Sequence, residues 1–254
     1  MLEVAHFEAG NYRYIRGPFQ YSGGVRADAG YALRRIRFSK PVPVARGFDL
    51  IKSHLQSAGR PLTAFAACEL RSPAPFDDQG FIDFNRVYVG TLTDWGIFAN
   101  EENPVARSNV CPELTAPPEP SFHAFTYTVP GADGHADNPE FVIAGSGEAE
   151  ENSKPYSQRT VRLGDTTAEG LREKGCFVLG AMERRMQALG LGWSEVNVTQ
   201  VYTVFDLYPF FADEIVRRGA ANAGLTWYYA RPPVDTLDYE MDVRCVSEEH
   251  LAKV

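Results

Sequence analysis

The order of helix and strand patterns occurs twice along the chain, and this repeat limits the fold more than any other feature of the sequence. Each half reads as an apolar segment ending in small residues, a helix, an alternating strand, a second helix and a closing strand. When Gly59 is placed over Gly190, the strand residues Phe65 and Val196 fall into register. A repeated element order predicts a diverged duplication.

Two units follow from this repeat. The residues between 130 and 140, PGADGHADNPE, are rich in Gly, Pro and Asp and have no periodicity, so we place the join there. The predicted domains are residues 1–130 and residues 139–254, each an α+β unit whose mixed sheet carries two helices on one face. The expected helices lie near residues 48–58, 82–95, 166–190 and 209–218, and the expected strands near 19–24, 65–70, 122–129, 141–147, 196–201 and 237–243.

Composition excludes several classes of protein. A hydrophobic content of 44% over 254 residues predicts a folded chain, and a net charge of -8 argues against nucleic acid or an anionic membrane as partner. We find no apolar run of about 18 residues and no signal-peptide pattern, so we expect a cytosolic protein. Histidines stand far apart, and no HExxH, GxGxxG, GxxxxGK[ST] or GxSxG motif occurs. The sequence therefore predicts neither a metal site nor a cofactor.

Several segments resemble the reactive-intermediate deaminase family, known as Rid or YjgF-like. In the second half these are LGLGWSEVNVTQVYTVFDLYPFFADEIVRRG and the final strand DYEMDV, and in the first half NPVARSNV and YSGG. The resemblance implies two tandem chorismate-mutase-like (Rid-like) units and a homotrimer with sites in clefts between neighbouring domains. It also implies hydrolysis of enamines or imines to a carbonyl and ammonia without a cofactor.

The resemblance also implies which residues carry the chemistry. Arg107 in NPVARSNV matches the family's arginine, and Glu240 in DYEMDV matches its strand acid. The second half has no arginine in Ala223–Thr226, and His123 stands near the place of the acid in the first half. Each half thus keeps one member of the pair, which predicts either a composite site or a site in which His123 replaces the acid.

Each of these residues also has a structural interpretation. The structural interpretation of Arg107 is a surface arginine, and that of His123 is a structural histidine. Strand alternation allows Glu240 to lie on a solvated face. Arg231 before two prolines is either a second anion anchor or the end of a strand. The remaining predicted substrate-binding residues are small turn formers whose backbone N–H groups would face the ligand: Ser22, Gly23 and Ser146.

The expected function is hydrolytic deamination of an unsaturated 2-amino acid to ammonia and a 2-oxo acid. The tandem arrangement and acidic balance resemble the 2-aminomuconate deaminases, which implies aminomuconate or a substituted aminomuconate as substrate. Two alternatives stay open: a Rid-type module that binds a carboxylate metabolite without turnover, and a chorismatase-like hydrolase. An ammonia-release assay separates the enzyme from the binder.

Overall fold

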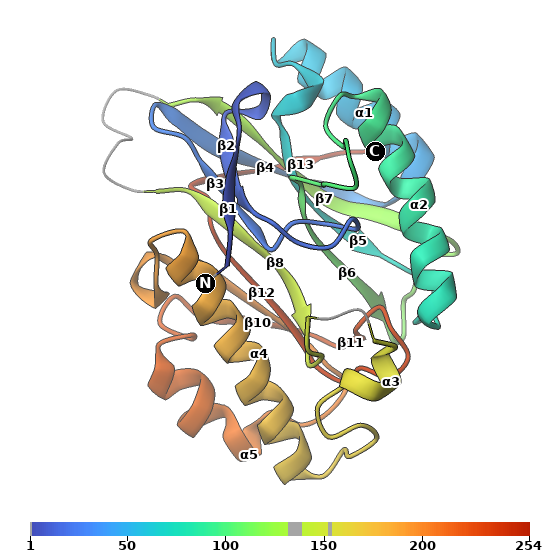
Figure 1. The fold of residues 1–254 in the computed structure, drawn as a ribbon, viewed down its shortest axis with the longest axis vertical. Coiled ribbons are helices and arrows are strands. Elements are labelled where there is room, and N and C mark those ends of the chain that lie inside the picture. The colour runs from blue at the N-terminus through green and yellow to red at the C-terminus, as the bar shows by residue number, and fades with distance from the viewer. Residues whose placement is uncertain (1, 132–138, 152–153) are drawn as a thin grey trace.

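The computed structural model describes residues 2–131, 139–151 and 154–254 and shows two β-sheets packed face to face, with helices on their outer faces (Figure 1). The layers therefore run helix, sheet, sheet, helix. The site described below lies where strands from both sheets end, so the sheet order is given first.

The six-stranded sheet has the order β11-β6-β5-β7-β4-β13. Most of its strands come from the first half of the chain, and β11 and β13 come from the second. β5 pairs in parallel with β6, and β13 pairs in parallel with β4. The strands are β4 (Tyr31–Pro43), β5 (Phe65–Arg71), β6 (Ala106–Pro112), β7 (Ser121–Pro130), β11 (Ala230–Arg231) and β13 (Glu248–Ala252).

The seven-stranded sheet has the order β1-β2-β3-β8-β12-β9-β10. Its first three strands come from the N-terminal end of the chain, and β3 pairs antiparallel with β8 across the midpoint of the sequence. The strands are β1 (Val4–Phe7), β2 (Tyr12–Ile15), β3 (Gly24–Ala27), β8 (Phe141–Gly147), β9 (Val198–Tyr202), β10 (Leu225–Tyr228) and β12 (Glu240–Cys245).

Helices cover the outer faces of both sheets. α1 (Val44–Ser57) and α2 (Asp78–Asp94) pack on the six-stranded sheet, and α4 (Ala168–Ala188) packs on the other sheet with α5 (Tyr208–Phe210) and its continuation Phe211–Val216. The Asp77 side chain caps α2 by accepting from Gly80 N at 2.7 Å. Among the helices that the structure describes, none has the length and apolar character of a membrane-spanning helix.

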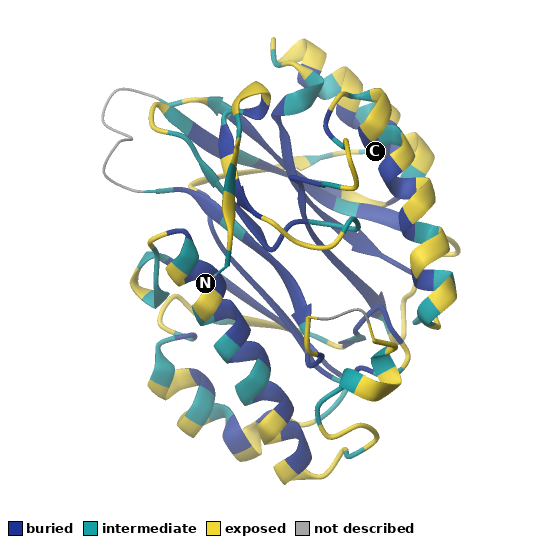
Figure 2. Cartoon of the chain, in the orientation of Figure 1, coloured by how far each residue is buried: buried dark blue, intermediate teal, exposed yellow. Residues whose placement is uncertain are grey.

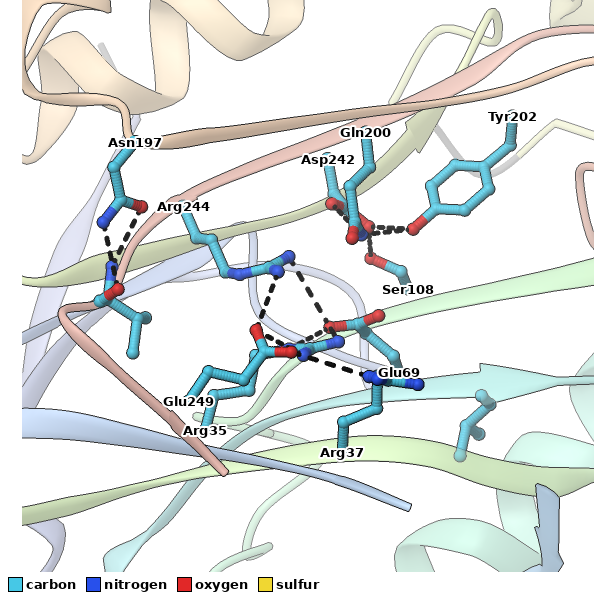
Figure 3. Close-up of polar contacts among 12 residues, drawn as sticks. Arg35, Arg37, Glu69, Ser108, Asn197, Gln200, Tyr202, Asp242, Arg244 and Glu249 are labelled. Carbon is cyan, nitrogen blue, oxygen red and sulfur yellow. Dashed lines mark hydrogen bonds and ion pairs between the residues drawn. The ribbon is translucent and has the colours of Figure 1, made fainter. Parts of the chain in front are cut away.

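The inner faces of both sheets are buried against each other (Figure 2). Small and aromatic residues fill part of this layer, and ionised groups fill the rest: Arg35 pairs with Glu69 and Glu249 at 2.7 Å, and Arg244 lies beside the same two acids (Figure 3). Ser108 and Tyr202 donate hydrogen bonds to Asp242. Strands such as β5 and β12 are consequently buried on both faces.

The prediction of two tandem chorismate-mutase-like, Rid-like units is wrong. Each sheet contains strands from both halves of the chain: β1, β2 and β3 complete the second half's sheet, and β11 and β13 complete the first half's sheet. Sheet edges offer unpaired N–H and C=O groups, and the exchanged strands bind them. Element order along the sequence carries no information on this exchange, because it concerns pairing between distant segments.

Several local predictions are confirmed. The long helix begins after Thr167, whose Oγ1 accepts from Gly170 N at 3.2 Å, and Gly190 follows it with φ +74°. The expected strand over 19–24 is wrong, since only Ser22 makes an isolated bridge and β3 begins at Gly24. Most of the predicted join, residues 132–138, lies outside the described residues. The division into 1–130 and 139–254 stays a prediction.

Candidate active site

A pocket of about 750 Å³ is lined by residues of β6, β8, β12, α3 (Tyr156–Arg159) and the start of α2. Figure 1 shows where these elements lie in the fold. Both sheets contribute to the pocket. β6 belongs to the six-stranded sheet, and β8 and β12 belong to the seven-stranded one. Side chains from both halves of the sequence therefore meet in this pocket, Arg107 and Glu240 among them.

Arg107 is the most unusual side chain of the pocket. It is 2% exposed, yet none of its three guanidinium nitrogens has a hydrogen-bond partner in the described part of the chain. Its Cζ instead lies 4.9 to 5.8 Å from the ring centroids of Tyr88, Tyr21, Phe84 and Phe81. Aromatic faces compensate a buried cation only in part, and its N–H donors stay free. The geometry is that of a site for an anion.

Glu240 begins β12, where it pairs with Gly147 of β8 and Tyr202 of β9. It is 4% exposed, because the second sheet covers the strand face that could have been solvated. Burial raises the pKa of Glu240 well above its ordinary value, the nearby Asp242 raises it further, and Arg107 opposes the shift. Burial therefore favours the protonated form of the carboxyl group, which can donate its proton to a ligand.

Further basic groups line the pocket. Arg159 stacks on the ring of Tyr156 at 3.6 Å and donates to Glu150 O at 2.6 Å. Arg185 donates to Ala144 O at 2.9 Å and pairs with Glu151 at 2.6 Å. The lining contains four basic side chains, Arg107, Lys154, Arg159 and Arg185, and two carboxylates besides Glu240, Asp78 and Glu151. With Glu240 protonated, the pocket has an excess of positive charge.

The three small residues predicted at the ligand divide into two groups. Ser146 lines the pocket, and its hydroxyl group donates a long hydrogen bond of 3.4 Å to Gly147 O. Ser22 is fully buried and outside the lining; its N–H donates to Val105 O at 2.9 Å. Gly23 is also outside the lining, and its N–H donates to Ile15 O at 2.9 Å.

His123 and Arg231 lie elsewhere. His123 is on β7 between Arg71 and Glu69, and burial together with Arg71 lowers its pKa to about 3. Arg231 is partly exposed and pairs with Glu113 through contacts of 2.7 and 3.0 Å. Neither side chain lines the pocket. In residues 2–131, 139–151 and 154–254 no group of three or more His, Cys, Asp or Glu side chains is arranged to hold a metal ion.

Several pocket residues were not predicted from the sequence. Tyr21, Tyr156 and Arg159 are among them, and none of the three lies in a recognisable motif. Arg185 did leave a signal. The buried stripe of α4 includes Leu171, Val178 and Met182, and Arg185 continues that stripe although it is charged. A basic residue on the apolar face of a helix requires a buried partner, which is how Arg185 could have been found.

Two comparisons with known proteins agree on one family. A model of the family described as 2-aminomuconate deaminase CnbZ matches residues 4–250. A 2-amino-5-chloromuconate deaminase from Comamonas testosteroni is 52% identical over 244 residues, which cover 96% of this chain and 97% of the relative. Membership of the Rid family is not shown by these matches.

Two solved structures, both of cyanuric acid hydrolases, are similar to this chain. One, described as an evolutionary innovation by structural concatenation, has a TM-score of 0.42 and 9% identity over 88% of this chain and 69% of its own. The other, from A. caulinodans, has a TM-score of 0.39 and 13% identity over 87% of this chain and 68% of its own.

Proposed function

Because the chain belongs to the family of 2-aminomuconate deaminases, CnbZ, we propose that it hydrolyses 2-aminomuconate or a substituted 2-aminomuconate to ammonia and a 2-oxo acid. The buried guanidinium of Arg107 carries this proposal. Its three nitrogens have no partner in the described chain, and a substrate carboxylate supplies two acceptor oxygens in the geometry that a guanidinium fits.

Arg107 fixes the reacting end of the substrate. The 2-carboxylate of an aminomuconate is attached to the carbon that bears the amino group, so an arginine that binds this carboxylate also places the C–N bond. The aromatic rings around Arg107 exclude water and strengthen the ion pair, because the local dielectric constant is low.

We assign the proton transfers of the reaction to Glu240. A 2-amino dienoate is an enamine, and the protonated Glu240 donates its proton to a carbon of the diene, which converts the enamine to an iminium ion. The carboxylate so formed accepts a proton from the water that adds to the C=N carbon. Glu240 returns that proton to the nitrogen of the neutral carbinolamine. As the C–N bond breaks and ammonia leaves, the Glu240 carboxylate takes the proton of the carbinol hydroxyl, which forms the C=O bond and restores the protonated Glu240. The sum is one substrate and one water giving one 2-oxo acid and one ammonia.

The charge of the pocket supports a dicarboxylate substrate. Four basic side chains face two carboxylates and a protonated Glu240, so the pocket has an excess of two positive charges, which a dianion neutralises. Arg159 is the side chain we assign to the second carboxylate, because its Nε is buried and has no partner among the described residues. A substrate with one carboxylate would leave the positive charge of Arg159 without a substrate anion.

The experiment is an ammonia-release assay with freshly generated 2-aminomuconate and, in parallel, 2-aminoacrylate. We expect ammonia from 2-aminomuconate far above the uncatalysed rate and a smaller kcat/KM with 2-aminoacrylate. No release from either substrate, together with saturable binding, would favour a carboxylate-binding module instead. The homotrimer stays a prediction, which sedimentation at micromolar concentration would test.

A further inference from the structure

Directly behind the pocket, the carboxylate of Glu148 holds the backbone that leads into Glu240. Glu148 follows β8 and is fully buried. Asp238 N–H donates to its Oε1 at 2.6 Å, and Tyr239 N–H donates to its Oε2 at 3.0 Å. One carboxylate thus binds two consecutive amides immediately before Glu240, and such a two-point contact fixes the orientation of a peptide as well as its position.

Lys174 of α4 pairs with both Glu148 and Asp238. It lies on the buried stripe of α4 and is itself fully buried. Its Nζ is 3.6 Å from Glu148 Oε1 and forms an ion pair with Asp238. The contact therefore joins the end of β8, the middle of α4 and the start of β12. None of the three side chains lines the pocket, so their effect on a ligand is indirect.

We propose that Glu148 is a positioning residue for Glu240, which it serves in two ways: it holds the backbone at residues 238 and 239, and it places a negative charge behind the Glu240 carboxyl group. The inference rests on the proposed function, in which Glu240 touches the substrate. Glu148 itself is not a catalytic residue, because it has no access to the pocket.

The electrostatic part has a defined sign. Burial raises the pKa of Glu148 to about 7, against the amide N–H groups and Lys174, which lower it, so Glu148 is ionised above neutral pH. Its charge raises the pKa of Glu240. Replacing Glu148 by a neutral residue therefore lowers the pKa of Glu240. The other titratable groups that interact with Glu240, all kept in that variant, are Asp242, Arg107, Arg71, Tyr21, Tyr156 and Cys111.

The test compares Glu148→Gln with Glu140→Gln. Glu140 is the matched control, because it is also a buried carboxylate next to β8, at the opposite end, and accepts from the backbone N–H groups of Leu33 and Ser247. We expect Glu148→Gln to lower kcat at least about tenfold with little change in KM. The basic limb of the pH profile of kcat should move to lower pH by about 0.5 unit or more. Glu140→Gln should lose thermal stability without either effect.

A second variant separates the backbone contact from the charge. Glu148→Asp keeps the charge but is one methylene shorter, so it reaches only one of the two amides. We expect it to lower kcat while the basic limb stays in place. This variant also carries the test if Glu148→Gln does not accumulate as folded protein. Wild-type kcat in Glu148→Asp would contradict the backbone part of the proposal.

A direct titration makes the test independent of turnover. The pKa of Glu240 is followed by ¹³C NMR, with Glu240→Gln for assignment, and is expected to fall in Glu148→Gln and to stay unchanged in Glu140→Gln. An unchanged Glu240 pKa in Glu148→Gln, or equal effects of both variants, would overturn the inference. A wild-type protein that releases no ammonia would instead refute the proposed function, and the titration would still decide the role of Glu148.

Discussion

Gly145 of β8 lies directly beneath the carboxyl group of Glu240. A Cβ placed on Gly145 would stand 2.1 Å from Glu240 Oε1 and 3.1 Å from its Cδ. A Cβ atom essentially never approaches a non-bonded heavy atom so closely, so the carboxyl group occupies space that only a glycine leaves free. The two residues belong to adjacent strands, β8 and β12, and their fit decides where the acid of the pocket points.

Gly145→Ala should therefore displace the Glu240 carboxyl group and lower kcat, by roughly tenfold or more, while KM changes less, because Arg107 is untouched. Gly90→Ala is the control. Gly90 is an exposed position in α2 with no atom within 4 Å of an added Cβ, and an alanine there should raise stability by up to about 1 kcal/mol without affecting turnover. Normal kcat in Gly145→Ala would contradict the assigned position of Glu240.

Arg107→Ala should lower kcat/KM at least about 30-fold, since loss of a charge-assisted pair to a buried carboxylate costs roughly 2 to 5 kcal/mol. Arg107→Lys should recover only part of the activity, because an ammonium group cannot form the two parallel bonds of a guanidinium. Arg231→Ala serves as control, because Arg231 pairs with Glu113 outside the pocket. If Arg231→Ala were the more damaging change, the anion site would be wrongly assigned.

Glu240→Gln should lower kcat by roughly 100-fold or more, the usual contribution of general acid–base catalysis. It should also stabilise the protein in a pH-dependent manner. The pKa of Glu240 is higher in the folded state than in the unfolded chain. As pH rises between these two values, the unfolded chain loses the proton while the folded protein keeps it. The wild-type protein therefore loses stability over this pH range. The melting temperature of Glu240→Gln relative to wild type should thus increase from pH 4 to pH 8. A constant difference would mean that Glu240 ionises normally.

Arg159→Ala tests the second carboxylate. A partly exposed ion pair contributes about 1 kcal/mol, so KM for 2-aminomuconate should rise roughly fivefold. KM for 2-aminoacrylate, which has one carboxylate, should not change. Arg217→Ala removes a comparable surface arginine, paired with Asp213 on its own helix, and should leave both values unaltered. Equal losses on both substrates would place Arg159 outside substrate recognition.

His123→Gln distinguishes the two acid–base candidates. Because burial and Arg71 hold the pKa of His123 near 3, its imidazole is neutral throughout a pH range of about 5 to 9 and cannot produce an inflection there. We expect kcat and its pH profile to match those of the wild type. A lost inflection in His123→Gln, with Glu240→Gln fully active, would reverse the assignment.

Local structure was largely predictable from the sequence. The helix after Thr167 has its capping hydroxyl, its apolar stripe and its terminating glycine within one stretch of chain, and all three are local signals. The prediction of a strand over 19–24 was wrong. That segment meets β6 only through a single bridge at Ser22, and the backbone N–H groups of Ser22 and Gly23 donate to Val105 and Ile15. Such distant partners leave no periodicity in the segment itself.

The sequence by itself determined the amphipathic helices and most strands, and short motif resemblances indicated Arg107 and Glu240, which both line the pocket. Only the tertiary structure decided that strands cross between the sheets and that Glu240 faces a second sheet rather than water. It also placed Arg107 among four aromatic rings and His123 away from the pocket. The physical reason is the range of the interactions: caps and periodicity act within a few residues, whereas burial, strand pairing and the charge around a carboxyl group depend on segments more than a hundred residues apart.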